Sequence, residues 1–461
     1  MALRDLLKAP LDQTQSDAQH FMERVQGNII KGHGRHHAAH VFVKFGADVA
    51  AARAWIAGAM FRRLTLAKPQ AAQTTRWRAV RGPGEPFFAF FLSHNGYVSL
   101  GVADASPGDP YFRAGMKSAP GGGPTITDPP VSQWDANFRG DIDAMVLVAH
   151  ADRGHLDPLI GELTNELRQI GAQFFVERGD QQTFDFGERK NVEIEHFGHQ
   201  DGISQPRMIQ QEADDEIEQR GGVYWDPVAP LELGFVEEPG GNDQFGSYLV
   251  FRKLEQNVRA FRAARDGLAA ALGIDAENAA ALAVGRFRDG RPVLPTTVVS
   301  PGADPNDFSF KTDKDAMICP YQAHIRKTNP RGDLAAFIPN QTDKSERALR
   351  ILRRGITYGE RPDLAPDSKL PAPETGIGLL FMCYQSGLIS FILQQDGADS
   401  NEFVKPGVGP DATLGVNTAP LAQQWPVNGV PNAKPFLMAN FIRMLGGEYF
   451  FAPSPAFLKA L

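Results

Sequence analysis

The same order of predicted strands and helices occurs twice along this chain. In the first half the periodicity predicts strand, helix, strand, strand, helix and strand, at residues 39–45, 48–60, 87–101, 144–149, 155–170 and from 173 onward. The second half has a similar order with insertions, at residues 247–253, 255–265, 351–358, 378–384, 386–394 and 446–451. The order β-α-β-β-α-β is that of a ferredoxin-like unit. We therefore expect an α+β protein of two related halves with antiparallel sheets, and not a doubly wound parallel sheet.

Length and charge narrow the class of protein further. The chain has 461 residues, which corresponds to about three domains of roughly 150 residues or to two larger ones. Hydrophobic residues make up 42% and charged residues 22%, which excludes a disordered or coiled-coil chain. The formal net charge is −7 at pH 7. Because nucleic acids and anionic membranes bind basic surfaces, we expect this protein to bind neither.

The cysteines, the N-terminal residues and one charge-free stretch indicate where in the cell the protein is located. Cys319 and Cys383 can form at most one disulfide, and we interpret them as reduced thiols of an intracellular protein. The first ten residues carry charges where a signal peptide needs an apolar run, so the expected location is the cytoplasm. Residues 375–395 include no charged residue, but their glycines, serines and glutamines predict a buried strand, a turn and a packed helix rather than a membrane span.

Three segments hold residues that could carry chemistry, and the first surrounds Asp201. Glycines flank this acid in Gly198-His199-Gln200-Asp201-Gly202. An Asp-Gly pair usually marks a turn, so Asp201 could be a turn or cap residue only. The alternative is a rigidly placed carboxylate that moves a proton.

The second segment places His324 beside a basic cluster of Arg326, Lys327 and Arg331. Such a histidine can be a structural residue on a solvated face. It can also be an axial metal ligand, because neutral imidazole is the usual proximal ligand of haem in peroxidases. In that case the basic cluster would suit the anionic propionates of a haem.

The third segment contains the pair Arg353-Arg354 between apolar residues. Both arginines could lie on the surface, as arginines usually do. One of them could instead point inward, where a guanidinium is costly unless it faces an anion.

Taken together and in this order, the three segments resemble the dye-decolorising peroxidase family. Residues 198–202 match its Gly-x-x-Asp-Gly signature, and residues 323–331 are similar to its proximal-histidine region. Residues 353–359 resemble its distal-arginine region, and residues 378–385 resemble the strand that follows. The opening of the longer, fungal-type and cyanobacterial-type members is similar to residues 25–35, so the resemblance covers most of the chain.

The resemblance implies a fold and a cofactor. It implies two ferredoxin-like domains, which we place at residues 1–190 and 191–461, with the segment of Asp201 in the second. One haem b per chain would be bound in the C-terminal domain. The expected function is a haem peroxidase that reduces hydrogen peroxide and oxidises dyes, phenols and other small aromatic one-electron donors.

The resemblance also implies roles for individual residues. His324 would be the proximal ligand of the haem iron, Asp201 the distal acid–base residue and Arg353 the distal arginine, with Arg354 as the fallback. Besides Arg326 and Arg331 near the propionates, two residues of one strand face would form the wall of the distal pocket: Leu379 and Phe381.

Three features remain open at this point. Tyr358 lies where some family members have a surface tyrosine that oxidises bulky dyes, although a tyrosine there could also be ordinary surface. His199 departs from the family pattern, in which an apolar residue is common at this position. The ring of His324 needs an acceptor on its other nitrogen, for which Asp396 and Glu402 are in plausible segments only.

The chemistry expected of Asp201 favours acid conditions. Peroxide must lose a proton at one oxygen and gain it at the other before its O–O bond breaks, and carboxyl groups, with an ordinary pKa of about 4, do this best at low pH. The alternative function is a haem-binding or iron-release protein with incidental peroxidase activity. For the oligomeric state, a monomer and a homodimer are both possible.

Overall fold

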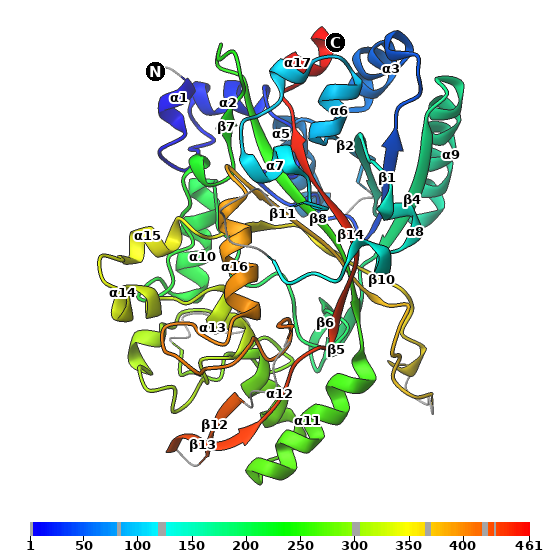
Figure 1. The fold of residues 1–461 in the computed structure, drawn as a ribbon. Helices are drawn as coiled ribbons and strands as arrows, with labels where there is room; N and C mark the ends of the chain where they lie inside the picture. The colour runs from blue at the N-terminus through cyan, green and yellow to red at the C-terminus, as the bar shows by residue number, and fades with distance from the viewer. Residues whose placement is uncertain are drawn as a thin grey trace.

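The computed structural model describes residues 3–80, 84–118, 126–296, 305–364, 370–416, 423–427 and 430–461. Strands run through the middle of the molecule, and helices lie around them (Figure 1). Both ends of the chain lie on one side, at the short helices α1 (Leu3–Leu6) and α17 (Pro455–Ala460).

The first half contains the predicted order of elements. They are β1 (His37–Lys44), α3 (Val49–Trp55), β2 (Phe87–Leu92), β3 (Ala144–His150), α9 (Arg153–Gln169) and β4 (Gln173–Asp180). Short helices precede β1 or fill the connections: α2 (Ser16–Met22), α4 (Phe61–Arg63), α5 (Ala67–Val80), α6 (His94–Ser99), α7 (Pro110–Ala114) and α8 (Ala136–Arg139). A hairpin follows β4, formed by β5 (Thr183–Phe186) and β6 (Arg189–Glu193).

The second half repeats this order, as predicted, around long insertions. Its repeated elements are β8 (Phe245–Gln256), α11 (Val258–Leu272), β9 (Leu352–Arg353), β10 (Ile356–Tyr358), β11 (Gly378–Gln385), α16 (Ile389–Asp399) and β14 (Ile442–Ala452). The remaining elements are α10 (Gln210–Arg220), β7 (Val236–Glu237), α12 (Ala276–Val284), α13 (His324–Thr328), α14 (Asp333–Phe337), α15 (Asp343–Arg347), β12 (Gln423–Val427) and β13 (Val430–Phe436).

The strands of both halves form one antiparallel sheet in the order β10-β11-β8-β14-β2-β3-β1-β4. The halves join in the middle of this order, where Phe451 of β14 pairs with Leu92 of β2. They also meet at its two ends. The hydroxyl of Thr357 in β10 donates to the carbonyl of Asp180 in β4 (2.7 Å) and accepts the N–H of Gln182 (2.7 Å). The expected α+β fold of two ferredoxin-like halves is confirmed.

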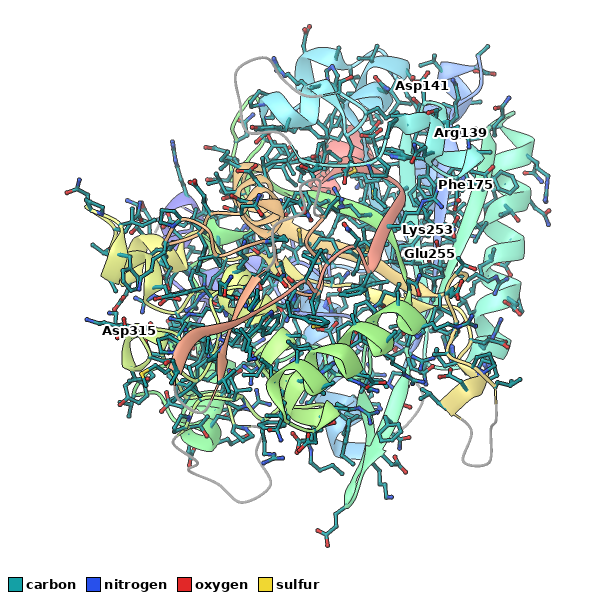
Figure 2. All side chains as sticks on the ribbon, turned by 60° about the horizontal axis from the view of Figure 1, so that its bottom comes forward. Arg139, Asp141, Phe175, Lys253, Glu255 and Asp315 are labelled. Carbon is teal, nitrogen blue, oxygen red and sulfur yellow. The ribbon has the colours of Figure 1, made fainter. Side chains whose placement is uncertain are left out.

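An ion pair crosses between the two halves near this junction. Lys253 of β8, which is labelled in Figure 2, lies 3.0 Å from Glu177 of β4 and 2.8 Å from Asp135. Its ammonium also lies 5.4 Å from the centre of the Tyr358 ring. Because Lys253 and Glu177 are both largely buried, this contact is screened less by salt than a surface pair would be.

Both faces of the sheet are buried, and each face belongs to a different core. Successive residues of a strand point to opposite faces. In β1, Val41 and Val43 pack with Leu163 of α9, whereas Phe42 points to the other core and meets Phe251 of β8 at 4.8 Å between ring centres. This explains why the strands are almost continuous apolar runs in the sequence rather than alternating ones.

The strand predicted at residues 87–101 is shorter than expected. It ends at Leu92, because Ser93 accepts the N–H of Gly96 (3.0 Å) and caps helix α6. A Cβ at position 96 would lie 2.0 Å from the carbonyl oxygen of Asp143. The strand expected at residues 87–101 was therefore too long, since this glycine lets a helix approach the end of β3.

The apolar segments form buried elements. The charge-free stretch at 375–395 contributes β11 and most of α16, as predicted. Within the described ranges no single helix is long and apolar enough to cross a membrane, and only α11 and α12 together, bent by 107°, meet the length and composition criteria. Both cysteines are free and buried.

The N-terminal segment packs on the second half of the chain. Leu11 pairs with Ile209, and the ring of Phe21 in α2 contacts those of Phe235 and Phe245 at 5.2 and 5.5 Å. Residues before β1 thus adjoin residues that we assigned to the second domain. The boundary between residues 190 and 191 stays a prediction.

Because His40 of β1 is buried, the stability of the folded protein depends on pH. This residue is 0% exposed, and burial lowers the pKa of its imidazole to about 4. In the unfolded chain the pKa is ordinary, about 6.5, so the unfolded state binds more protons between these two values. The folded state therefore loses stability as the pH falls below about 6.5. From this residue we expect a loss of about 2 kcal/mol between pH 7 and pH 5.

Urea denaturation at both pH values of wild type and His40→Leu measures this contribution. Between pH 7 and pH 5, the free energy of unfolding of His40→Leu should fall by about 2 kcal/mol less than that of wild type. His20→Leu, at an exposed position, is the control and should behave as wild type. Equal losses in wild type and His40→Leu would contradict the prediction.

Candidate active site

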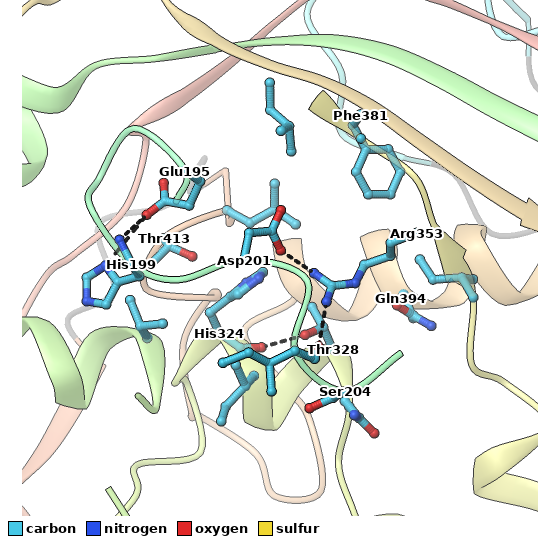
Figure 3. Close-up of a pocket in the computed structure, with 18 of the residues that line it drawn as sticks. Glu195, His199, Asp201, Ser204, His324, Thr328, Arg353, Phe381, Gln394 and Thr413 are labelled. Atoms are coloured by element: carbon cyan, nitrogen blue, oxygen red, sulfur yellow. Dashed lines mark hydrogen bonds and ion pairs between the residues drawn. The ribbon is translucent and has the colours of Figure 1, made fainter. Parts of the chain in front are cut away.

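A large cavity lies between the sheet of the second half and the insertions. The empty space inside it, including the part that is open to solvent, is about 1680 Å³. The main contributors to its lining are residues 195–206, β8, α13, residues 350–355, β11 and α16. Figure 3 shows Asp201, His324 and Arg353 around this space. The fold therefore brings together the three segments that the sequence analysis singled out.

His324 is the first residue of α13 and lines the cavity. Its Nδ1 lies 2.8 Å from Oδ2 of Asp411, and 30% of its side-chain surface remains exposed. Burial alone would lower the pKa of His324, but the Asp411 carboxylate raises it above its ordinary value. With Nδ1 engaged, Nε2 is the nitrogen left for a ligand.

Asp411 is fully buried and rigidly held. Its Oδ1 accepts the N–H groups of Thr413 (2.8 Å) and Leu414 (2.9 Å) and the Thr413 hydroxyl (3.0 Å). Burial would raise the pKa of Asp411, but His324 and these backbone donors hold it below its usual value. The carboxylate is therefore a charged acceptor for the His324 ring.

The sequence analysis missed Asp411. It named Asp396 and Glu402 instead, and both of these are exposed and outside the cavity lining. The available signal was the Asp-x-Thr spacing of a side-chain-stabilised turn at Asp411. That signal predicts a turn, but it does not reveal a contact with a histidine 87 residues away.

Asp201 and Arg353 form an ion pair inside the cavity. Nη1 of Arg353 lies 3.1 Å from Oδ1 of Asp201, and Nη2 donates to the carbonyl of Ile203 (2.9 Å). About a third of each side chain is exposed. A carboxylate and a guanidinium thus stand next to each other where a small molecule can reach both.

The loop of Asp201 is fixed by Glu195. The Glu195 carboxylate accepts the N–H groups of Phe197 (2.7 Å) and His199 (2.9 Å) and the side-chain amide of Gln256 in β8 (2.7 Å). The glycines on either side of Asp201 have φ values of 101° and 78°, which other residues rarely adopt. The Gly-x-x-Asp-Gly pattern is therefore a backbone requirement of this loop.

His199, the departure from the family pattern, lies behind the loop. It is 3% exposed, and its Nδ1 lies 3.6 Å from Oε1 of Glu195. The ring of Phe261 in α11 packs against it at 6.4 Å between centres. This histidine adds a polar ring to one edge of the cavity lining without displacing Asp201.

The two adjacent arginines point in opposite directions. Arg353 enters the cavity, whereas Arg354 donates to the carbonyls of Asn28 (2.8 Å) and Ile29 (2.9 Å) on the N-terminal segment. Arg353 is the last residue of β9 and Arg354 follows it, and only Arg353 lines the cavity. The geometry thus selects Arg353 rather than the fallback, Arg354.

Leu379 and Phe381 of β11 both line the cavity, and so does Arg331. The Arg331 guanidinium donates to the Ser204 hydroxyl (2.6 Å) and to the side-chain oxygen of Asn306 (2.7 Å). Burial lowers the pKa of Arg331 well below its usual value. These acceptors are neutral oxygens rather than carboxylates, so the positive charge of Arg331 is available to an anion.

Arg326 is not in the cavity, contrary to the prediction. Its guanidinium is 0% exposed and lies 2.7 Å from Asp333 and 3.2 Å from Asp313. The ring of Tyr321 packs on it at 4.5 Å. Because two carboxylates already surround this cation, it holds the insertion together instead of facing a propionate.

Tyr358 is not on the surface, contrary to the prediction. It is 8% exposed and belongs to the inner core between the two halves. Burial raises the pKa of its hydroxyl far above the ordinary value. A bulky dye cannot contact this ring directly in the folded protein.

Comparison with known proteins gives relatives over nearly the whole chain. The multifunctional dye peroxidase DyP2 of Amycolatopsis is 36% identical over 468 residues, covering 96% of this chain and 97% of its own. The chain belongs to the dye-decolorising peroxidase family. A dye-decolorizing peroxidase of Exidia glandulosa is 31% identical over 78% of this chain and 73% of its own. The crystal structure of an Anabaena DyP-type peroxidase matches with a TM-score of 0.87 at 37% identity, covering 99% and 98% of the two chains. A scan against models of protein families gives no match.

The protein is accordingly a haem peroxidase that acts on dyes, and its cavity fits the cofactor. Among the residues that the structure describes, no group of three or more His, Cys, Asp or Glu could hold a bare metal ion. A single imidazole, that of His324, therefore needs a cofactor that supplies the other ligands. Leu379 and Phe381 provide apolar surface for a macrocycle, and Arg331 provides a cation for its acidic groups.

The structural role of Arg326 can be tested against the predicted one. Arg326→Met leaves two buried carboxylates without their cation, so the free energy of unfolding should fall by about 3–5 kcal/mol. The folded fraction should bind haem with unchanged affinity, because the side chain does not reach the cavity. Thermal denaturation and haem titration at the Soret band measure the two quantities.

Arg331→Met is the matched comparison, since Arg331 lines the cavity. It should weaken haem binding. A loss of haem affinity in Arg326→Met without loss of stability would restore the original prediction.

Proposed function

We propose that one haem b per chain binds in this cavity with His324 as its proximal ligand, and that Asp201 and Arg353 act on hydrogen peroxide. The observation that carries this proposal is the arrangement around the cavity. A histidine with its Nδ1 on a buried carboxylate shares one cavity with a partly exposed Asp–Arg pair.

Asp411 orients the ligand and raises its basicity. Its carboxylate accepts the Nδ1–H of His324, which fixes the tautomer and leaves the Nε2 lone pair for the iron. Because Asp411 is held by three further donors, the imidazole cannot rotate without breaking a charged hydrogen bond.

Asp201 moves the proton of the peroxide. The Asp201 carboxylate takes the proton from one oxygen of hydrogen peroxide and gives it to the other oxygen. The second oxygen then carries two hydrogens and leaves as water. Arg353 is a fixed cation beside it and stabilises negative charge on the leaving oxygen. A haem held by His324 would supply the two electrons needed to break the O–O bond, and aromatic donors would return them one at a time.

The pocket residues limit what reaches this centre. Leu379 and Phe381 lie on one face of β11 and give the cavity an apolar wall above the arginine. This arrangement suits a small oxidant, while dyes and phenols, which are larger, donate electrons from the rim or from outside.

A haem-handling protein with incidental peroxidase activity is not favoured. Such a protein needs only a ligand and a cavity, and it gains nothing from an acid paired with an arginine. The Asp201–Arg353 pair together with the Glu195 contacts that hold its loop supports catalysis instead.

Replacing the acid or the arginine tests the mechanism. Asp201→Asn should slow the reaction of the haem protein with peroxide by about 10²–10⁴-fold, because general acid–base catalysis contributes that much. Arg353→Leu should slow it by about 10²–10³-fold. Stopped-flow absorption at the Soret band measures both rates.

Asp396→Asn, at an exposed position outside the cavity, is the control and should react as wild type. Wild-type rates in both Asp201→Asn and Arg353→Leu would rule out these roles.

The role of Asp411 is tested separately. Asp411→Asn removes the charged acceptor, so haem affinity or peroxide reactivity should fall about 10–100-fold. Glu402→Gln tests the residue that the sequence suggested and should have no effect, since Glu402 is exposed. Haem titration and the Soret spectrum give the comparison, and equal behaviour of the two variants would exclude Asp411 from this role.

A further inference from the structure

Lys327 is a buried lysine close to the haem ligand but turned away from the cavity. It follows His324 by three residues on α13 and is 4% exposed. Its ammonium donates to the carbonyls of Gly397 (2.9 Å) and Ser400 (2.7 Å). It does not line the cavity, so the propionate role expected of the basic cluster does not apply to it.

The two carbonyls belong to the C-terminal end of α16. The last carbonyls of a helix have no partner within it and carry a partial negative charge, which makes this end a good acceptor for a cation. The intervening carbonyl, that of Ala398, accepts the N–H of Asp411 (2.7 Å). The end of α16 is therefore shared between Lys327 and the residue that binds His324.

These contacts form a closed ring of interactions. Starting at His324, the ring passes through the Nδ1 hydrogen bond to Asp411 and through the Asp411 N–H to the end of α16. The hydrogen bonds from Lys327 to the end of α16 close the ring, because Lys327 lies on α13 one turn after His324. The adjacent Ala412 N–H also donates to the carbonyl of Gln322, just before α13.

We propose that Lys327 is a positioning residue for the haem ligand, because it fixes the end of α16 on which Asp411 rests. Lys327 acts on His324 through Asp411 and touches neither substrate nor cofactor. This inference rests on the proposed role of His324 and explains why a helix of only five residues can present a ligand in one orientation.

The charges around Lys327 support this assignment. Burial lowers the pKa of its ammonium to about 8, while Asp411 and Asp399 oppose that shift. The lysine thus stays largely protonated at pH 7, with all three hydrogens available as donors. A buried ammonium is costly, and two backbone acceptors with nearby carboxylates offset that cost.

The first test is hydrogen exchange on the full chain, both haem-free and haem-loaded. Lys327→Met keeps the unbranched stem and removes the ammonium. The amides of Asp411, Thr413 and Leu414 should then exchange about 10–100-fold faster, since hydrogen bonds to a charged group are lost at their support. Amides of the distant strands β1 and β3 should be unchanged.

The second test is the iron–imidazole stretching band of the reduced haem protein. Lys327→Met should shift this band to lower frequency, in the same direction as Asp411→Asn, because the acceptor on Nδ1 is less firmly held. Lys327→Arg, which retains donors, should restore part of the shift. Lys68→Met, which breaks an exposed pair with Glu23, is the matched control and should not move it.

Either of two results overturns the proposal: unchanged exchange at residues 411–414, or a uniform increase over the whole chain with an unmoved band. The second result would mean that Lys327 only adds stability. If Lys327→Met does not fold, Lys327→Gln, which keeps one donor group, gives the same readouts. Exchange in the haem-free chain does not depend on the peroxidase mechanism, so its failure is distinct from failure of the proposed function.

Discussion

The buried hydrogen bond between Asp411 and His324 is the contact on which the rest of the site depends. It sets which ring nitrogen faces the cavity and how the ring is turned. A carboxylate can do this only if it stays charged inside the protein, and Asp411 does so because backbone and hydroxyl donors occupy its other oxygen. The helix end beneath it and the buried Lys327 extend the same constraint outward.

The part of the cavity that contains Asp201 and Arg353 is organised differently. There the reactive groups remain partly exposed, and the backbone around them is rigid. Glu195 accepts two N–H groups of the Asp201 loop and so holds the loop in place. Rigid support with an accessible reactive group is what preorganised electrostatic catalysis requires.

The order of strands and helices and the main segments of the cavity could be predicted from local patterns in the sequence. The repeated β-α-β-β-α-β order follows from the spacing of apolar residues, which depends only on the geometry of a strand and a helix. The Gly-x-x-Asp-Gly pattern singled out Asp201 through its resemblance to the family signature, and the structure gives the physical basis of the pattern, since both glycines have positive φ values. His324 and Arg353 lie in segments with similarly specific neighbours.

Other residues were assigned wrongly because their surroundings depend on how the chain folds. Arg326 looked like a propionate ligand, yet the carboxylates that hold it, Asp313 and Asp333, lie outside the cavity lining. Tyr358 looked exposed, but its strand, β10, meets β4 of the other half, and the tyrosine is buried at this contact. Burial at such positions depends on how the halves pack, which local patterns do not encode.

The sequence by itself determined the class of fold, which follows from short-range periodicity, and its resemblance to a known family singled out the three segments around Asp201, His324 and Arg353. Only the tertiary structure decided which of two arginines enters the cavity, which acid supports the histidine, and which cations are already paired. These outcomes depend on contacts that form only when the chain folds, and their energies are decided by burial and by the charges that folding brings together.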